Sequence, residues 1–201
     1  MMQPQADDWD DAGPAEPLGV KCTDSDCGND LHCFKRTRAM ARENAPRGEC
    51  RACRQHLVEL DRTRQRRPGD RDYLLQSLHK ELIRHHFWHL PLDQKAFDKA
   101  VRNGRRGLHE AAQKRLRTSV GKAEPFRDGT QTPMHGDAVY YAQHATASCC
   151  RTCIEYWHGI PKGYELTDEE LDYLHGLVVG YLDTRLPDLQ DEPTKPSRRS
   201  R

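Results

Sequence analysis

The stretch from Cys22 to Cys53, CTDSDCGNDLHCFKRTRAMARENAPRGECRAC, decides the expected fold of this chain. It holds five of the eight cysteines, four of them arranged as Cys22-x4-Cys27 and, after a gap of 22 residues, Cys50-x2-Cys53. Two such pairs of thiols can enclose one tetrahedral zinc ion, which needs four ligands. Gly28 permits the tight turn that follows a metal-binding cysteine. We therefore predict zinc on Cys22, Cys27, Cys50 and Cys53.

The second pair stands at the start of a predicted helix from Arg51 to Arg67. A first cysteine pair in a tight turn, followed by a second cysteine pair at the start of a helix, resembles the treble-clef class of zinc fingers. The resemblance covers about Cys22 to Arg66. Cys33 is expected to be a small buried apolar group. His56 shares a predicted helix face with Cys53 and is an alternative ligand. The competing interpretation is a set of reduced structural thiols.

The composition favours a small core held by metal. Hydrophobic residues make up 35% of the 201 residues and charged residues 31%, so little apolar surface is available for burial. Metal binding can compensate, because its free energy adds to that of folding. We see no signal peptide and no apolar run long enough to cross a bilayer. These absences predict a cytoplasmic protein with no membrane partner, whose cysteines stay reduced, rather than a secreted disulfide scaffold.

The expected fold class is mainly α: a small metal-stapled helical domain preceded by the treble-clef-like module. The predicted parts are an acidic disordered leader (1–18), the zinc module (19–67), a helical domain (68–187) and a disordered tail (188–201). Periodicity and stop signals predict helices at 34–44, 51–67, 72–90, 92–102, 107–120 and 149–158. A capping box at Thr167 and Glu170 begins a last helix that runs to about Leu186. Residues 138–142 form the one candidate short strand.

A second cluster of cysteines and histidines occupies QHATASCCRTC (143–153) and WHGIPKGYELT (157–167). This run resembles an uncharacterised bacterial domain family with the signature QHATATCC-R-x-C followed by WH-x-IPKG-x-ELT. The likeness spans about Phe87 to Tyr181. The family carries no assigned activity, so the resemblance implies domain boundaries and no function.

Spacing limits the ligands of this cluster. Cys150 and Cys153 are three residues apart and share one helix face, as do Cys149 and Cys153, four apart. His144 can fold back from the preceding loop, and His158 is the favoured fourth ligand if the last helical turn unwinds. We predict a second zinc on His144, Cys150, Cys153 and His158. The spacing also resembles the iron–sulfur loop of helix-hairpin-helix DNA glycosylases, and unliganded buried or reactive thiols are a further alternative.

Residues 61–122 carry 16 Lys and Arg against 7 Asp and Glu, a local excess of +9 within a chain of net charge +1. Basic clusters beside a zinc module suit the phosphates of DNA or RNA, and a solvated charged surface is the plainer alternative. The candidate nucleic-acid-binding residues are Arg62, Arg64, Arg66, Arg67, Arg105, Arg106, Lys114 and Arg115. His85 and His89 could share a metal, but a polar rim on an amphipathic helix is the simpler interpretation.

The primary hypothesis is a non-catalytic nucleic-acid-binding module whose helices are held in register by zinc. The alternative is a metal-dependent enzyme of hydrolase type, in which an incompletely filled C-terminal site keeps one position open for water. A third hypothesis is a protein-interaction adaptor. The number of protein ligands at the C-terminal site separates the first two.

Overall fold

The structure is a computed structural model that describes residues 19–193. Its elements are η2 (Cys27–Asn29), α1 (Arg38–Arg42), α2 (Leu60–Thr63), η3 (Pro68–Asp70), α3 (Arg71–His79), α4 (Leu82–His89), α5 (Gln94–Ser119), α6 (Ala138–Ala145), α7 (Arg151–His158) and α8 (Asp168–Arg185), where η marks 3-10 helices. Within these residues the β-structure consists of isolated bridges and no sheet. The predicted mainly α fold is confirmed. The predicted leader lies outside the described residues, as do positions 194–201 of the predicted tail.

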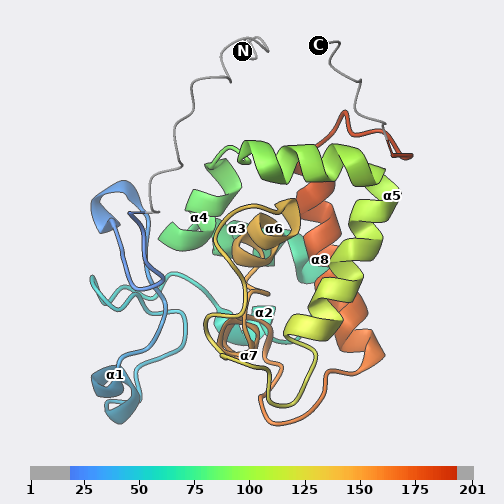
Figure 1. Ribbon diagram of the computed structural model, residues 1–201. Coiled ribbons are helices and arrows are strands. Elements are labelled where there is room, and N and C mark those ends of the chain that lie inside the picture. The colour runs from blue at the N-terminus through green and yellow to red at the C-terminus, as the bar shows by residue number, and fades with distance from the viewer. Residues whose placement is uncertain (1–18, 194–201) are drawn as a thin grey trace.

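The main core is built around α6. Figure 1 shows the long α5 arching over α6, with α8 beside it and α4 on the opposite side. The side chains that fill this core come mostly from α4, α5, α6 and α8; the larger ones are Ile83, Phe87, Leu108, Leu116, Tyr141, Leu174, Val178, Tyr181 and Leu182. This packing fixes both ends of the loop between α6 and α7, which carries two of the C-terminal cysteines.

The predicted short strand at 138–142 is wrong, because these residues form the first part of α6. Asp137 is the N-cap of this helix, and its carboxylate accepts a hydrogen bond from the backbone N–H of Val139 at 2.9 Å. Nearly every residue of α6 is buried. A helix enclosed on all sides shows an unbroken apolar run, and periodicity alone cannot distinguish such a run from a buried strand.

The predicted helix over 51–67 is also wrong. Cys50 and Cys53 therefore do not lie at the start of a helix, as the expected treble-clef arrangement requires. Residues 51–53 form a turn instead, closed by the hydrogen bond from the Arg54 N–H to the Cys50 carbonyl at 3.0 Å. Arg54 has a φ of 65°, and the bridge between Glu49 and His56 reverses the chain. Of the predicted helix only α2 remains.

The other predicted helices are confirmed with changed ends. The capping box of Thr167 and Glu170 begins α8, which is capped at Leu186 as expected. The predicted helix 72–90 is divided at Lys80 and Glu81 into α3 and α4. The predicted helix 34–44 is shortened to α1. The helix after the C-terminal cysteines begins at Arg151, with Cys150 as its N-cap.

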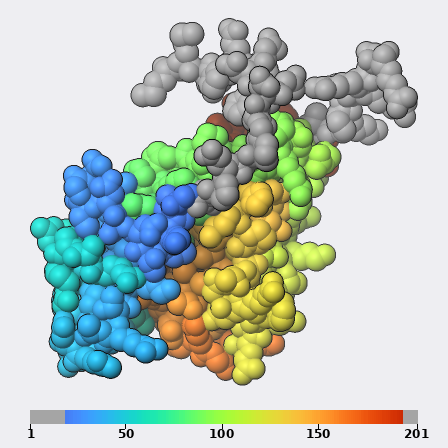
Figure 2. Space-filling view, turned by 60° about the vertical axis from the view of Figure 1, so that its left-hand side comes forward, coloured from blue at the N-terminus to red at the C-terminus, as the bar shows by residue number. Residues whose placement is uncertain are grey.

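The N-terminal segment 19–59 packs on the helical domain through a second core. Phe34 and Val58 of this segment meet Leu78 of α3 and Trp157 of α7, with Phe34 and Trp157 rings in edge-to-face contact at 5.8 Å. Figure 2 shows the first described residues, in dark blue, lying against the gold segment that includes α6. The segment thus shares its hydrophobic core with the helices that follow it.

The expected break between residues 102 and 107 is a sharp kink within α5. Gly104 has φ 67° and ψ 171°, a backbone conformation that is essentially restricted to glycine. The N–H groups of Arg105 and Arg106, freed by the kink, donate to the carbonyls of Gln190 and Asp191 at 2.8 and 3.3 Å. The described part of the predicted tail therefore caps the second half of α5.

Gly104→Ala is expected to lower the free energy of unfolding by about 1 to 3 kcal/mol, since an L-residue is strained at this φ and ψ. An added Cβ would also lie 2.6 Å from the backbone of Glu192. Gly107→Ala, in the regular part of α5 with 3.5 Å of clearance, is the matched control and should be neutral or stabilise by up to about 1 kcal/mol. Urea unfolding of both variants measures the two free energies of unfolding. Equal values would contradict the expected strain of an L-residue at position 104.

None of the helices in the described part of the chain combines the length and the apolar character that a bilayer span requires.

Candidate metal centres

The first cluster consists of Cys27, His32, Cys50 and Cys53, whose ligand atoms all lie within 4.8 Å of one another. The Sγ atoms of Cys27 and Cys50 are 3.7 Å apart, and the Sγ of Cys53 is 3.7 Å from Nδ1 of His32. Zinc bonds of about 2.3 Å to sulfur and 2.0 to 2.1 Å to nitrogen make a tetrahedron with edges of about 3.8 Å between sulfurs and 3.6 Å from sulfur to nitrogen. These separations fit a zinc ion with three thiolates and one imidazole.

Two turns and one bridge place these four side chains. Cys27 begins η2 inside the turn closed by the bridge between Asp26 and Leu31. His32 is tied to the start of α4, because its N–H donates to the Lys80 carbonyl at 2.7 Å and its carbonyl accepts from Leu82 at 2.9 Å. Cys50 and Cys53 flank the second turn. The cluster therefore connects separate loops of the N-terminal segment and lies beside the α3–α4 junction.

The His32 ring is oriented for metal binding through Nδ1. Its Nε2 lies 2.9 Å from the carboxylate of Asp30, which accepts the ring N–H. Metal-ligating histidines usually donate their second ring N–H to such a partner, which fixes the tautomer. Nδ1 is then the free lone pair, and it is the atom that faces Cys53.

The surroundings of Cys50 favour its thiolate. Burial opposes its ionisation, but backbone N–H groups, including that of Ala52 at 3.4 Å, lower the pKa of Cys50 to about 6. Burial and the hydrogen bond with Cys50 raise the pKa of Cys27 to about 11. One thiolate thus already exists near neutral pH, and metal binding would displace the proton of Cys27.

His32 is the site residue that sequence reasoning missed, and Cys22 is not in the first cluster. The signal was present, because Cys27-x4-His32 has the same spacing as Cys22-x4-Cys27. The prediction paired cysteines only with cysteines and therefore did not include His32. His56 does not join the cluster, and its Nε2 instead bonds to the Arg47 carbonyl at 3.0 Å.

The second cluster consists of Cys149, Cys150 and Cys153, again with all three sulfurs within 4.8 Å of one another. Cys149 and Cys150 end the loop after α6, and Cys153 lies in the first turn of α7. The Sγ of Cys150 caps α7 by accepting the Cys153 N–H at 3.4 Å. All eight cysteines are free thiols.

A buried arginine reaches the thiols of this second cluster. Arg84 is 2% exposed and donates to the Sγ of Cys153 at 3.1 Å and, more weakly, to that of Cys149 at 3.7 Å. Its Nε binds the Glu81 carboxylate at 3.0 Å, which also accepts from Trp157 Nε1 at 3.0 Å. Hydrogen bonds from the two neighbouring thiols and the charge of Arg84 lower the pKa of Cys153 well below its usual value.

His144 and His158 are not members of the second cluster in the described structure. Nε2 of His158 contacts the Thr146 carbonyl at 3.0 Å, and its Nδ1 contacts the Tyr173 hydroxyl at 3.0 Å. Nε2 of His144 lies 3.2 Å from the carbonyls of Thr132 and Pro133, while its buried Nδ1 has no partner among the described residues. Burial lowers the pKa of both histidines to about 4, so both rings are neutral.

The histidines of α4 form a small group of their own. The rings of His85 and His89 stack at 4.0 Å, and Nδ1 of His89 bonds to the His85 carbonyl at 2.7 Å. A backbone bond at Nδ1 orients that ring without metal. The His79 ring lies 6.0 Å from that of His89 and packs on the Trp88 ring at 4.8 Å, as expected of a polar helix rim.

The basic candidates are scattered over several elements and many are paired. Arg62 pairs with Asp70 at 2.7 Å, Arg105 with Asp183 at 2.7 Å, and Arg106 with Glu192. The half-buried candidates make intramolecular contacts: Arg64 lies against Gly159, Arg66 donates to the His158 carbonyl, and Arg115 donates to the Gln131 carbonyl. Arg67 and Lys114 are exposed and have no ion pair among the described residues.

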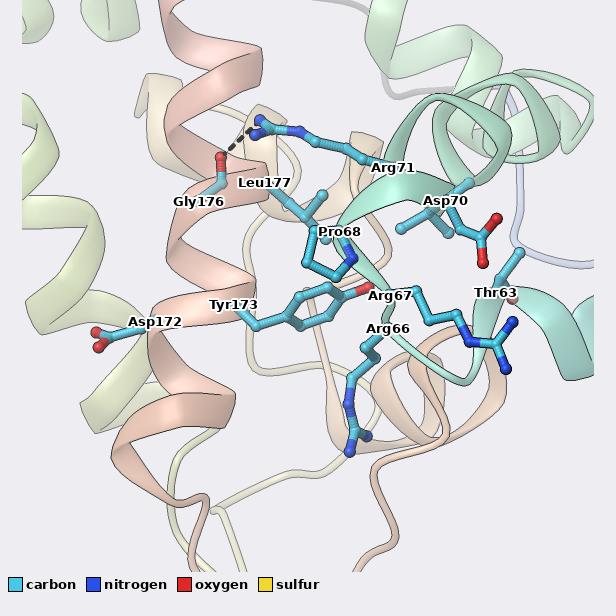
Figure 3. Close-up of a pocket in the computed structure, with 11 residues that line it drawn as sticks. Thr63, Arg66, Arg67, Pro68, Asp70, Arg71, Asp172, Tyr173, Gly176 and Leu177 are labelled. Atoms are coloured by element: carbon cyan, nitrogen blue, oxygen red, sulfur yellow. Dashed lines mark hydrogen bonds between the residues drawn. The ribbon is translucent and has the colours of Figure 1, made fainter.

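A cavity of about 300 Å³ lies between η3 and α8. Figure 3 shows Tyr173 reaching from α8 towards Pro68, with Arg66 and Arg67 on one side and Arg71 bound to the Gly176 carbonyl on the other. Three arginines therefore surround one opening.

A family model, Domain of unknown function (DUF4186), matches residues 72–183. The chain belongs to the DUF4186 family. The matched residues include Cys149, Cys150 and Cys153, whereas the Cys27/His32/Cys50/Cys53 cluster precedes the DUF4186 domain. No solved structure matches the chain.

Proposed function

We propose that this DUF4186 protein is a zinc-binding protein, in which one ion held by Cys27, His32, Cys50 and Cys53 fixes the N-terminal segment against the helical domain. The observation that carries the proposal is the agreement of the two 3.7 Å separations with the edges of a zinc tetrahedron. The donor set, three thiols and one oriented imidazole, is typical of structural zinc.

The role proposed for this ion is structural. Four protein ligands close the coordination sphere, and catalytic zinc instead keeps a position for water or substrate. The bound ion cross-links the turn at Cys27, the turn at Cys50 and the backbone beside α4. This supports the non-catalytic hypothesis for the N-terminal site.

The zinc content of purified full-length protein tests this proposal. Elemental analysis should find zinc bound stoichiometrically, and His32→Ala should lower the content by one ion per chain. His32→Cys is the matched control, because a fourth thiolate can occupy the same position, and it should keep the ion. Full zinc content in the His32→Ala protein would reject this ligand set.

A second candidate function is nucleic-acid binding, which we propose only for the arginines around the cavity. Arg66 and Arg67 lie beside one another there with Arg71 opposite, and a phosphate group is the natural ligand for such an arrangement. The paired state of Arg62, Arg105 and Arg106 removes those side chains from the proposed surface.

The double change Arg66→Ala and Arg67→Ala should weaken binding to labelled DNA or RNA. It should also reduce the slope of the logarithm of the binding constant against the logarithm of the salt concentration by about 2, one unit for each lost phosphate contact. Arg106→Ala is the control and should leave binding unchanged, because its guanidinium already pairs with Glu192. Fluorescence anisotropy at low salt measures both. Absence of binding by duplex and single strands up to roughly 100 μM would exclude this function.

A further inference from the structure

The second cluster brings three thiols together without a fourth protein ligand. The sulfurs of Cys149, Cys150 and Cys153 lie within 4.8 Å of one another, and no other cysteine, histidine or carboxylate of the described chain joins this group. Zinc bonds of about 2.3 Å place two sulfur ligands about 3.8 Å apart, so each pair needs to close by at most about 1 Å to share one ion. This cluster therefore offers three ligands, where the first cluster offers four.

The two neighbouring histidines are held by other partners. His158 uses both ring nitrogens, one with the Thr146 carbonyl and one with the Tyr173 hydroxyl, each at 3.0 Å. Two carbonyls lie 3.2 Å from Nε2 of His144, and Phe87 stacks on its ring at 4.5 Å. The remaining nitrogen of His144, Nδ1, lies outside the group of close sulfurs. The fourth position of an ion on these sulfurs is thus left to a ligand from outside the chain.

Arg84 is the outer partner of the cluster. Its guanidinium donates to the Sγ of Cys153 at 3.1 Å and to that of Cys149 at 3.7 Å. The Glu81 carboxylate at 3.0 Å and the His144 carbonyl at 2.7 Å hold the same guanidinium in place. Metal ligands are commonly oriented by such outer hydrogen bonds. Arg84 therefore orients two of the three sulfurs and stabilises negative charge on them.

The charges around the cluster favour a divalent ion. Thiolates select soft ions, among them zinc and monovalent copper. A divalent ion with three thiolates carries a net charge of −1, whereas monovalent copper with three thiolates carries −2. Arg84 supplies one positive charge, which it already shares with Glu81. Because a buried charge without a partner is costly, the divalent ion, with the smaller uncompensated charge, fits better.

The same charges decide the state of a water molecule at the fourth position. Three thiolates reduce the positive charge that the ion presents to the water, and a hydroxide would add one more negative charge to the site. Hydrolytic zinc sites such as those with three neutral histidines lack this penalty and form hydroxide near neutral pH. The water on the second cluster therefore stays neutral, which makes it a displaceable ligand and a poor nucleophile.

We propose that Cys149, Cys150 and Cys153 bind a second divalent ion, zinc, as three thiolates, and that a neutral water completes its coordination. The ligands are separate from those of the proposed function, and the two sites share only the choice of metal. The first site is closed by four protein ligands. The second keeps one position at which a neutral donor can replace water.

X-ray absorption at the zinc edge tests this ligand set in full-length His32→Ala protein, in which the second ion is expected to remain alone. The spectrum should fit three sulfurs and one oxygen, without the outer-shell scattering that an imidazole ligand adds. Four sulfurs, or three sulfurs with one imidazole, would overturn the proposal, because a protein side chain then closes the site. Zinc-free His32→Ala protein would overturn it as well.

Serine variants identify the ligands in a chain that keeps His32. Cys149→Ser, Cys150→Ser and Cys153→Ser should each lower the zinc content from two ions per chain to one. The affinity for the lost ion should fall by more than the roughly 10- to 100-fold that loss of an outer-shell partner costs. Cys33→Ala is the matched control, since Cys33 is equally buried and lies outside both clusters, and it should keep both ions.

The two proposals fail in different ways. Two ions per chain in any of the three serine variants would reject the second site. If His32→Ala keeps two ions while Cys153→Ser loses one, the proposed ligand set of the first cluster fails and the second site stands.

Discussion

Cys50→Ser is expected to release one zinc ion per chain and to unfold the N-terminal segment. Cys50 is fully buried, its Sγ lies 3.7 Å from that of Cys27, and its pKa of about 6 favours the thiolate near neutral pH. Structural zinc in isolated finger peptides contributes about 10 to 16 kcal/mol of binding free energy. Domains of this size are stable by about 5 to 15 kcal/mol in total, so loss of even part of that contribution is severe.

Hydrogen exchange and zinc analysis of the same sample measure this effect. Amides of residues 27–59 should lose protection, whereas those of α5, α6 and α8 should keep much of theirs, because these helices have a separate core. Cys33→Ala is the control, since Cys33 is equally buried but lies outside both clusters. If Cys50→Ser retains its zinc and its exchange protection, the first site is assigned incorrectly.

Arg84→Met is expected to lower the free energy of unfolding by about 3 to 5 kcal/mol, the usual cost of breaking a buried ion pair by removing one partner. The change leaves the Glu81 carboxylate buried without its cation, with Trp157 Nε1 as its remaining side-chain donor. It also removes the donors to Cys153 and to the His144 carbonyl. Arg84 is thus a central residue between α4, the α6–α7 loop and α7.

The double variant Glu81→Gln with Arg84→Met separates the charge effect from packing. It should recover part of the lost stability, because no unpaired buried charge remains. Arg117→Met is the matched control: its partner Asp168 is 77% exposed, and surface pairs contribute about 0 to 1 kcal/mol. Urea unfolding of the four proteins at fixed zinc concentration gives these values. Equal costs for Arg84→Met and Arg117→Met would show that the buried network contributes little.

Much of the helical architecture was predictable from local sequence signals. The capping box at Thr167 and Glu170 begins α8 where expected, because both hydrogen bonds form between residues three apart. The break near Gly104 was equally local, since only glycine adopts its backbone conformation readily. The helical conformation of α6 was not predictable from such local signals. Its first five residues (138–142, AVYYA) are apolar or aromatic without a break, and only the surrounding helices reveal that they form a helix and not a strand.

The sequence by itself determined that soft ligands gather in two groups, one before and one within the DUF4186 domain. It also determined three members of the first structural cluster (Cys27, Cys50 and Cys53) and two of the second (Cys150 and Cys153), because close spacing brings thiols together. Only the tertiary structure decided the remaining neighbours. His32 joins the first cluster because its backbone bridges to Glu81, and Cys22 lies outside both clusters, packed against the main core. Arg84 reaches the thiols from a helix more than 60 residues away in sequence. Such contacts depend on how the chain folds back on itself, and no spacing along the sequence encodes them.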